Sequence, residues 1–219
     1  MSTFRVATVI LAFGIDCVPI PPPDPPTVST PPPTDAATPP SGPTSHRVVF
    51  LTEKVVEGHS IGGVRGADRI CQAEAQGAGL EGRFLAWISD SRTSPSIRFQ
   101  RSSVPYVLTN GDEVAQNWDD LVNGSLPQRA RIAVTASRRG VGGQEAGECR
   151  VWTGTLANGS ANLQYGFCGD WSERDSTGGI GFWDSPESGG CDAPQEELWS
   201  GGEASNRCDQ RRRLYCFQQ

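Results

Sequence analysis

The sequence GGVRGADRICQAEAQGAGLEGRFLAWIS, residues 62–89, predicts an amphipathic helix followed by a buried strand. Apolar residues recur at helical spacing from Val64 to Gln76, and two glycines just beyond this range favour a helix end. The helix is therefore expected to bury Cys71. Residues 83–89, RFLAWIS, are apolar at both alternating sets of positions, which predicts a strand that is buried on both faces and central in its sheet.

Segments on both sides of this pair add further strands and turns. Residues 47–52 are β-branched and apolar, and residues 106–109 and 113–115 can form a hairpin across Asn110-Gly111, a dipeptide that accepts positive φ. Further expected elements are strands at 131–135, 150–155 and 213–217, a helical turn from Pro95, and a short helix with Asn117 as its N-cap. Residues 169–209 have little periodicity and are expected to be mostly loop. This pattern is typical of an α+β fold.

The N-terminal residues have the features of an export signal. Arg5 precedes the apolar residues 6–15, a stretch of secretory-signal length that is too short to span a bilayer as a stable helix. Cys17 follows, where a bacterial lipoprotein signal carries its lipidated cysteine, although Asp16 stands where such signals have a small residue. Residues 1–17 are interpreted as an export signal with Cys17 as a candidate lipidation site. A plain secretory signal and an uncleaved anchor are the alternatives.

Residues 18–45 are rich in Pro, Thr, Ser and Asp and have almost no apolar side chains, so they cannot form a core. We expect an extended, polyproline II-like spacer that reaches about 3 Å per residue. Such a spacer would hold the remaining domain, residues 46–219, away from a cell surface. The PxxP spacing also fits an SH3 ligand, an alternative that export makes less favoured.

The cysteine count fits an exported domain. The chain has 7 cysteines, and those after Cys17 are Cys71, Cys149, Cys168, Cys191, Cys208 and Cys216. An even set in an exported domain indicates disulfides. Wide spacings, and histidine only at His46 and His59, argue against structural zinc. The net charge of −6 argues against nucleic acid as a partner, because phosphate contacts require many basic residues.

Seven segments of the chain, in order, resemble a known family. They are GGVRGADRIC, GLEGRFLAWISDS, VPYVL with NWDDLVNGS, ARIAV, RVWTG with NGS, FCGDW and the terminal RLYCF. In this order they are similar to endostatin, the C-terminal domain of certain collagens, and to related uncharacterised bacterial exported domains, over about His46 to Gln219. The resemblance implies a compact C-type-lectin-like fold with mainly antiparallel strands, one main helix, long loops and nested disulfides.

The resemblance also implies specific disulfide pairs. It pairs Cys71 with Cys216 and Cys168 with Cys208. Cys149 and Cys191 have no counterpart in endostatin, and we predict that they pair with each other. The zinc site of endostatin uses a cluster of N-terminal histidines that this chain lacks, so no metal or cofactor is carried over.

Endostatin binds heparin through arginines spread on one face. Here the residues after Ser45 are acidic overall. The basic runs Arg138-Arg139 and Arg211–Arg213 are therefore interpreted as solvated charges of loops and strand edges rather than as an anionic-glycan site.

The sequence also bears on calcium binding and on catalysis. The calcium-binding motifs of sugar-binding C-type lectins do not occur, and Trp118 in Asn117-Trp118-Asp119 is interpreted as a core residue. Acidic residues that could bind calcium in loops are Asp170, Glu173, Asp175, Asp184 and Glu187. No nucleophile and base emerge as a pair, since the cysteines are assigned to disulfides. A two-carboxylate glycosidase site is the enzymatic alternative.

The sequence thus predicts an exported, surface-tethered binding module without catalytic activity. Its expected partner is an unknown glycan or an extracellular matrix-type protein, with membrane contact only through lipid on Cys17. A structural envelope domain without a small ligand is the alternative. Burial of Trp171, Trp183 and Trp199 would weaken the binding hypothesis, because a binding surface would expose some of them.

Overall fold

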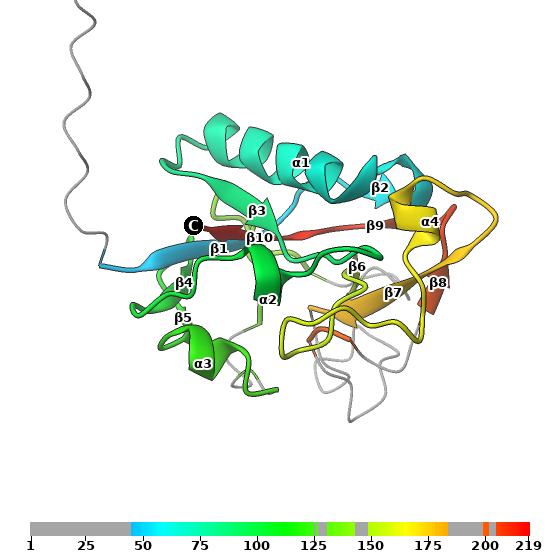
Figure 1. Cartoon of the computed structure of the whole chain (residues 1–219). Coiled ribbons are helices and arrows are strands. Elements are labelled where there is room, and N and C mark those ends of the chain that lie inside the picture. The colour runs from blue at the N-terminus through cyan, green and yellow to red at the C-terminus, as the bar shows by residue number, and fades with distance from the viewer. Residues whose placement is uncertain (1–44, 125, 127–130, 143–148, 184–198, 202–204) are drawn as a thin grey trace, which may run out of the picture. The chain divides into compact units, whose positions relative to one another are not determined.

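The structure, a computed structural model, describes residues 45–124, 126, 131–142, 149–183, 199–201 and 205–219 (Figure 1). The expected export signal with Cys17, and nearly all of the expected spacer, lie outside these residues. Within the described ranges, no helix is long and apolar enough to cross a membrane. The described chain is an α+β fold with mainly antiparallel sheets, one long helix and two disulfides.

A five-stranded sheet has the strand order β3-β10-β1-β4-β5. Its strands are β1 (Arg47–Leu51), β3 (Phe84–Ala86), β4 (Tyr106–Leu108), β5 (Glu113–Ala115) and β10 (Tyr215–Gln218). β10 runs antiparallel to both β1 and β3, whereas β1 and β4 are parallel. β4 and β5 form the expected hairpin, in which Gly111 has a φ of +97°. The C-terminal strand therefore lies inside the sheet.

β3 differs from its expected position. It lies at the edge of the sheet, not at its centre, although all three of its residues are buried. The helix α1 (Gly63–Gly77) packs along β3 and covers one face, and the Trp87 side chain beyond the strand belongs to a buried aromatic cluster. The helix α1 and the aromatic rings around Trp87 thus cover the apolar side chains of β3. This explains why β3 is apolar on both faces although it does not have a strand on each side.

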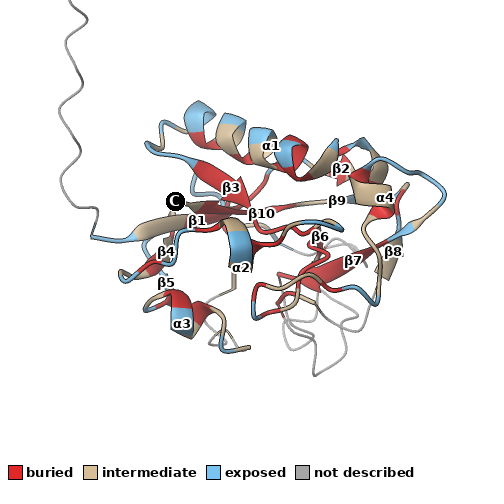
Figure 2. Cartoon of the chain, viewed as in Figure 1, coloured by how far each residue is buried: buried red, intermediate tan, exposed pale blue. Residues whose placement is uncertain are grey.

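The helix α1 lies across the five-stranded sheet (Figure 1). Its buried side chains are spaced so that they share one face: Val64, Ala67, Cys71 and Ala75. Figure 2 shows the opposite face exposed or only partly buried. The Cys71–Cys216 disulfide joins this buried face to β10.

Four shorter helical elements lie between the strands. They are η1 (Gly58–Ser60), α2 (Pro95–Arg98), α3 (Trp118–Leu121) and α4 (Cys168–Trp171). α2 begins at Pro95, as expected, and the Asn117 side chain caps α3 by accepting the Asp120 N–H at 2.9 Å. Trp118 is buried, as predicted.

Two smaller sheets complete the described fold. One consists of β6 (Arg150–Trp152), β7 (Thr177–Phe182) and β8 (Ser205–Arg207), and the other pairs β2 (Val56–Glu57) with β9 (Arg211–Arg212). The expectation that residues 169–209 are mostly loop was therefore wrong for β7 and β8. The strand expected at residues 131–135 is reduced to isolated bridges at Val134 and Thr135.

β7 was not predicted from the sequence pattern because three of its six residues are glycine. A Cβ on Gly178 would lie 2.7 Å from Cys168 Sγ, and a Cβ on Gly181 would lie 2.2 Å from the Trp199 carbonyl oxygen. Both contacts are too close for any side chain. Gly178 and Gly181 are required because these neighbouring atoms leave no room for a side chain. Glycine also removes the alternation of apolar and polar residues by which a strand is usually recognised.

Candidate functional site

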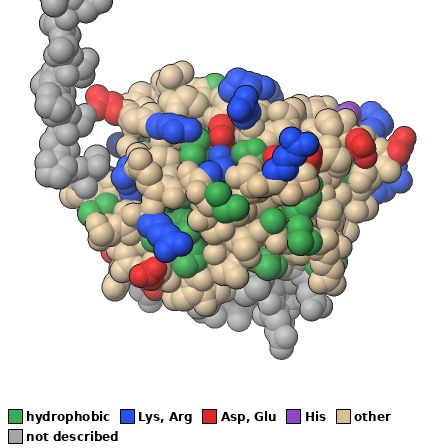
Figure 3. All heavy atoms as spheres, in the orientation of Figure 1, with side chains coloured by type: hydrophobic (Ala, Val, Ile, Leu, Met, Phe, Trp, Pro, Cys, Tyr) green, Lys and Arg blue, Asp and Glu red, His purple; other side chains and the backbone are tan. Residues whose placement is uncertain are grey.

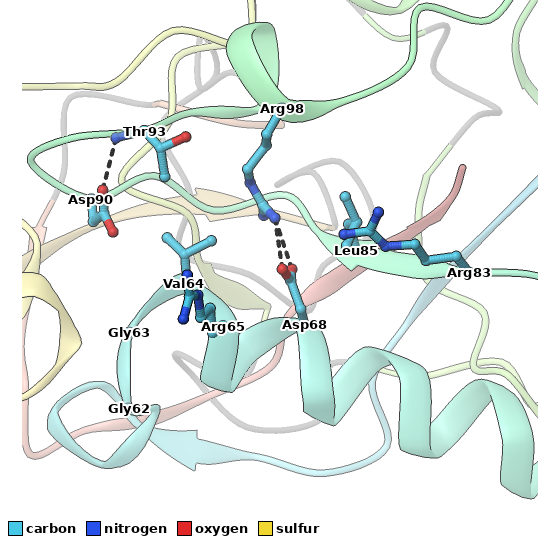
Figure 4. Close-up of a pocket in the computed structure, with 10 residues that line it drawn as sticks. All are labelled: Gly62, Gly63, Val64, Arg65, Asp68, Arg83, Leu85, Asp90, Thr93 and Arg98. Carbon is cyan, nitrogen blue, oxygen red and sulfur yellow. Dashed lines mark hydrogen bonds and ion pairs between the residues drawn. The ribbon is translucent and has the colours of Figure 1, made fainter.

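A groove of about 440 Å³ lies where the start of α1, β3, the loop after β3 and α2 meet. Its lining residues are Gly62, Gly63, Val64, Arg65, Asp68, Arg83, Leu85, Asp90, Thr93 and Arg98 (Figure 4). Three arginines face two aspartates in this lining. The groove lining therefore mixes charged and apolar groups, with a small excess of positive charge.

An ion pair between Asp68 and Arg98 joins α1 to α2 within the groove (Figure 4). Arg98 Nη1 donates to both carboxylate oxygens of Asp68, at 2.8 and 2.9 Å, and Nη2 donates to the Ala86 carbonyl oxygen. Asp68 Oδ1 also accepts the Ala86 N–H at 2.9 Å. Burial lowers the pKa of Arg98, while Asp68 acts in the opposite direction. The pair is mostly shielded from water and fixes α1, β3 and α2 relative to one another.

This pair provides a test of how the groove is held. Asp68→Ala is expected to lower the free energy of unfolding by about 2 kcal/mol, because it leaves the Arg98 charge and the Ala86 N–H without their acceptor. Asp68→Asn keeps an acceptor for Ala86 and should cost less. Urea unfolding of both variants measures the difference. Equal, near-zero losses for the two variants would contradict a supporting role of the ion pair.

Arg65 and Arg83 carry the unpaired positive charge of the groove. Both side chains are exposed, and neither has an ion-pair partner among the described residues. α1 begins beside them without a side-chain cap and without an acidic residue in its first turn. Its N-terminus therefore adds partial positive charge that no residue of the helix offsets. Figure 3 shows basic, acidic and apolar side chains interspersed on this face, with no continuous apolar patch.

The loop after β3 is held in place by its own hydrogen bonds. Asp90 Oδ1 accepts the N–H groups of Arg92 and Thr93, at 2.9 and 2.8 Å. Asp170 accepts both the N–H and the hydroxyl of Ser91, at 2.9 and 2.8 Å. This rim of the groove is ordered before any ligand arrives, which lowers the entropy cost of binding.

Asp170 comes from a turn with an uncommon backbone. In the segment labelled α4 (Cys168–Trp171), all four residues have positive φ, between 53° and 65°. Three of them are not glycine, and L-residues adopt this left-handed conformation at a cost of about 1 kcal/mol or more each. The turn is held by the Cys168–Cys208 disulfide, by a 2.7 Å bond from Trp171 Nε1 to the Ser89 carbonyl oxygen, and by a 3.1 Å bond from the Gly62 N–H to the Trp171 carbonyl oxygen. It therefore connects one disulfide to both ends of the groove.

The disulfides tie distant parts of the chain together without forming a reactive centre. The structure contains Cys71–Cys216 and Cys168–Cys208, the two pairs that the endostatin resemblance implies. Cys149 is also disulfide-bonded. Cys191, its predicted partner, lies outside the described residues, so that pairing stays a prediction.

The three loop tryptophans do not form an exposed surface. Trp171 is 0%, Trp183 2% and Trp199 8% exposed. This burial weakens the binding hypothesis, and it leaves the charged groove as the candidate site.

Those of the acidic residues singled out for calcium that the structure describes do not form a metal-binding group. The described ranges contain no group of three or more His, Cys, Asp or Glu side chains that could hold a metal ion. Asp170 is committed to Ser91, and Asp184 and Glu187 lie outside the described residues. His59 contacts the Cys208 carbonyl oxygen at 3.0 Å and Glu57 at 3.4 Å, and His46 contacts Ser45.

The carboxylate with a raised pKa lies outside the groove lining. Burial raises the pKa of Glu74 on α1, and its carboxylate accepts the N–H groups of Glu53 and Lys54 at 2.7 and 2.9 Å. These bonds hold the loop after β1. Glu74 therefore has a structural explanation, and it gives the glycosidase alternative no support.

The sequence predicts that function lies in the loops after Gly124, because residues 62–89 are explained as scaffold by their packing. The groove instead lies on this scaffold segment and its continuation to Arg98. A signal was present in the sequence: Arg65 and Arg83 are charged residues within the segment that decides the fold. Their convergence with Arg98 could not be read from spacing, because it depends on how α1, β3 and α2 pack. No family model matches the chain.

Proposed function

We propose that this protein is an exported, surface-tethered binding module without catalytic activity, and that its groove takes an anionic group of an extracellular glycan or matrix-type protein. The observation that carries the proposal is the pair of exposed arginines, Arg65 and Arg83, beside the buried Asp68–Arg98 ion pair. Carboxylate, sulfate and phosphate groups are the natural partners of guanidinium groups in such a setting.

The finer fold assignment belongs to the same proposal. An endostatin-like, C-type-lectin-like domain is supported by the seven ordered segments and by the nested disulfides Cys71–Cys216 and Cys168–Cys208. Export is supported by these disulfides, which form in oxidising compartments, and by the apolar residues 6–15. Tethering through Cys17 and the spacer at 18–45 completes the proposal.

A binding array tests the proposed ligand class. The oxidised, full-length protein would be applied to acidic and neutral glycans and to matrix proteins, with and without calcium. Arg65→Ala and Arg83→Ala are each expected to weaken binding of the acidic ligands by about tenfold, because each removes a charge-assisted hydrogen-bond donor. Arg101→Ala, an exposed arginine outside the groove lining, is the matched control. Retained binding in both groove variants would contradict the proposal.

A structural envelope domain without a small ligand is the second candidate. It is favoured by the burial of Trp171, Trp183 and Trp199 and by the small apolar surface of the described residues, where Ile97 and Leu163 are the exposed large hydrophobic side chains. This candidate predicts that the protein binds neither the acidic nor the neutral ligands of the array, and that the Arg65→Ala and Arg83→Ala variants behave like the wild type. The same experiment therefore separates the two candidates.

A further inference from the structure

Two arginines from distant parts of the sequence lie side by side away from the groove. Val151 on β6 and Arg213, next to β9, form a parallel bridge, and the Trp152 N–H bonds the Arg213 carbonyl oxygen at 3.0 Å. One residue earlier on each strand, this register places Arg150 next to Arg212. Neighbouring residues on adjacent strands project to the same face.

Other contacts fix the position of both guanidinium groups. Arg150 lies over the Phe182 ring, with 5.6 Å from its guanidinium carbon to the ring centre. Arg212 Nε donates to Asn206 Oδ1 at 2.9 Å, and Arg212 Nη1 donates to the Arg211 carbonyl oxygen at 2.7 Å. Each arginine is thus oriented by contacts with uncharged groups, and within the described part of the chain each keeps N–H donors that make no hydrogen bond.

Among the residues that the structure describes, no carboxylate compensates the charges of this pair. No ion pair joins Arg150 or Arg212 to a carboxylate among the described residues. Both side chains are partly buried, and burial together with the nearby Arg150 lowers the pKa of Arg212. Arginine stays protonated all the same. Two like charges next to each other on adjacent strands destabilise a sheet unless something neutralises them.

We propose that Arg150 and Arg212 form a binding site for a tetrahedral oxyanion, the sulfate or phosphate group of a small molecule or an esterified ligand. Such a group has enough acceptor oxygens to bond two guanidinium forks at once, which a single carboxylate does less well. The site is independent of the groove and of the function proposed for it.

Thermal unfolding of the oxidised, full-length protein tests this site. Inorganic phosphate and inorganic sulfate are added at constant ionic strength, with chloride and acetate as comparison anions. Phosphate and sulfate should raise the unfolding temperature above that in chloride, because a ligand that binds only the folded state stabilises it. Arg150→Gln and Arg212→Gln should each weaken the apparent affinity by about tenfold. Arg211→Gln is the matched control. Arg211 is the exposed neighbour of Arg212 on β9, and its substitution changes the net charge by the same amount.

A second measurement does not depend on the stability of the variants. The Nε–H resonances of Arg150 and Arg212 should shift together when inorganic phosphate is added to the wild-type protein, and that of Arg211 should not. A free sulfate and a sulfated monosaccharide, compared in the same titration, separate a site for the free ion from a site for an esterified group. The proposal is overturned if phosphate and sulfate give no more than the chloride response, if acetate equals them, or if the two variants respond like the wild type.

Discussion

Removing the Cys71–Cys216 disulfide is expected to lower the free energy of unfolding by about 5 kcal/mol. The bond closes a loop of 145 residues, and a long loop gives the unfolded chain the most entropy to regain when it is opened. Both sulfurs are fully buried between α1 and β10, so Cys71→Ala with Cys216→Ala keeps the site apolar. Chemical denaturation of the double variant, followed by circular dichroism, measures the loss.

The Cys168–Cys208 bond provides the comparison. It closes a loop of 40 residues and is expected to contribute about 4 kcal/mol. Its removal should in addition free the left-handed turn that carries Asp170, and so weaken ligand binding at the groove more than removal of Cys71–Cys216 does. A loss below about 1 kcal/mol for the longer loop would show that the chain-entropy account fails for this protein.

Trp87→Ala is expected to cost about 4 kcal/mol. Trp87 is fully buried, and four aromatic rings lie around it: Trp199 at 4.8 Å, Phe217 at 5.4 Å, Phe99 at 5.6 Å and Trp118 at 6.0 Å between ring centres. Its Nε1 donates to the Ser200 hydroxyl at 2.7 Å. The substitution removes the shared neighbour of all four rings and leaves a cavity.

Trp87→Phe separates packing from hydrogen bonding. It keeps an aromatic ring but not the donor to Ser200, and we expect a cost of about 2 kcal/mol. Circular dichroism in increasing urea is the suitable measurement, because the loss of a tryptophan changes the fluorescence baseline. Equal costs for the alanine and phenylalanine variants would mean that the ring contacts contribute little.

The elements that were predicted correctly depend on contacts between near neighbours. The α1 helix could be placed because its buried side chains recur every three to four residues and glycines follow it. The turn at Asn110-Gly111 and the cap at Asn117 were likewise predicted from residues that act on their own backbone. Local chemistry was sufficient in each case.

The features that were predicted wrongly depend on distant partners: the strand β3 was expected at the centre of its sheet, and β7 was expected to be loop. β3 is buried on both faces at a sheet edge because α1 and the Trp87 cluster cover it. β7 is a strand made half of glycine because Cys168 and the Trp199 backbone lie too close for side chains. Neither environment produces a periodic hydrophobic pattern in the sequence of its own segment.

The sequence alone therefore determined the α+β class, the main helix over Cys71, the turn chemistry and the even number of cysteines after Cys17. The tertiary structure decided which charges meet. It brought Arg65 and Arg83 to the Asp68–Arg98 pair, placed Arg150 beside Arg212, and buried Trp171, Trp183 and Trp199. The physical reason is that periodicity and capping act over a few residues, whereas the groove and the arginine pair arise from the packing of strands and helices that are far apart in the chain.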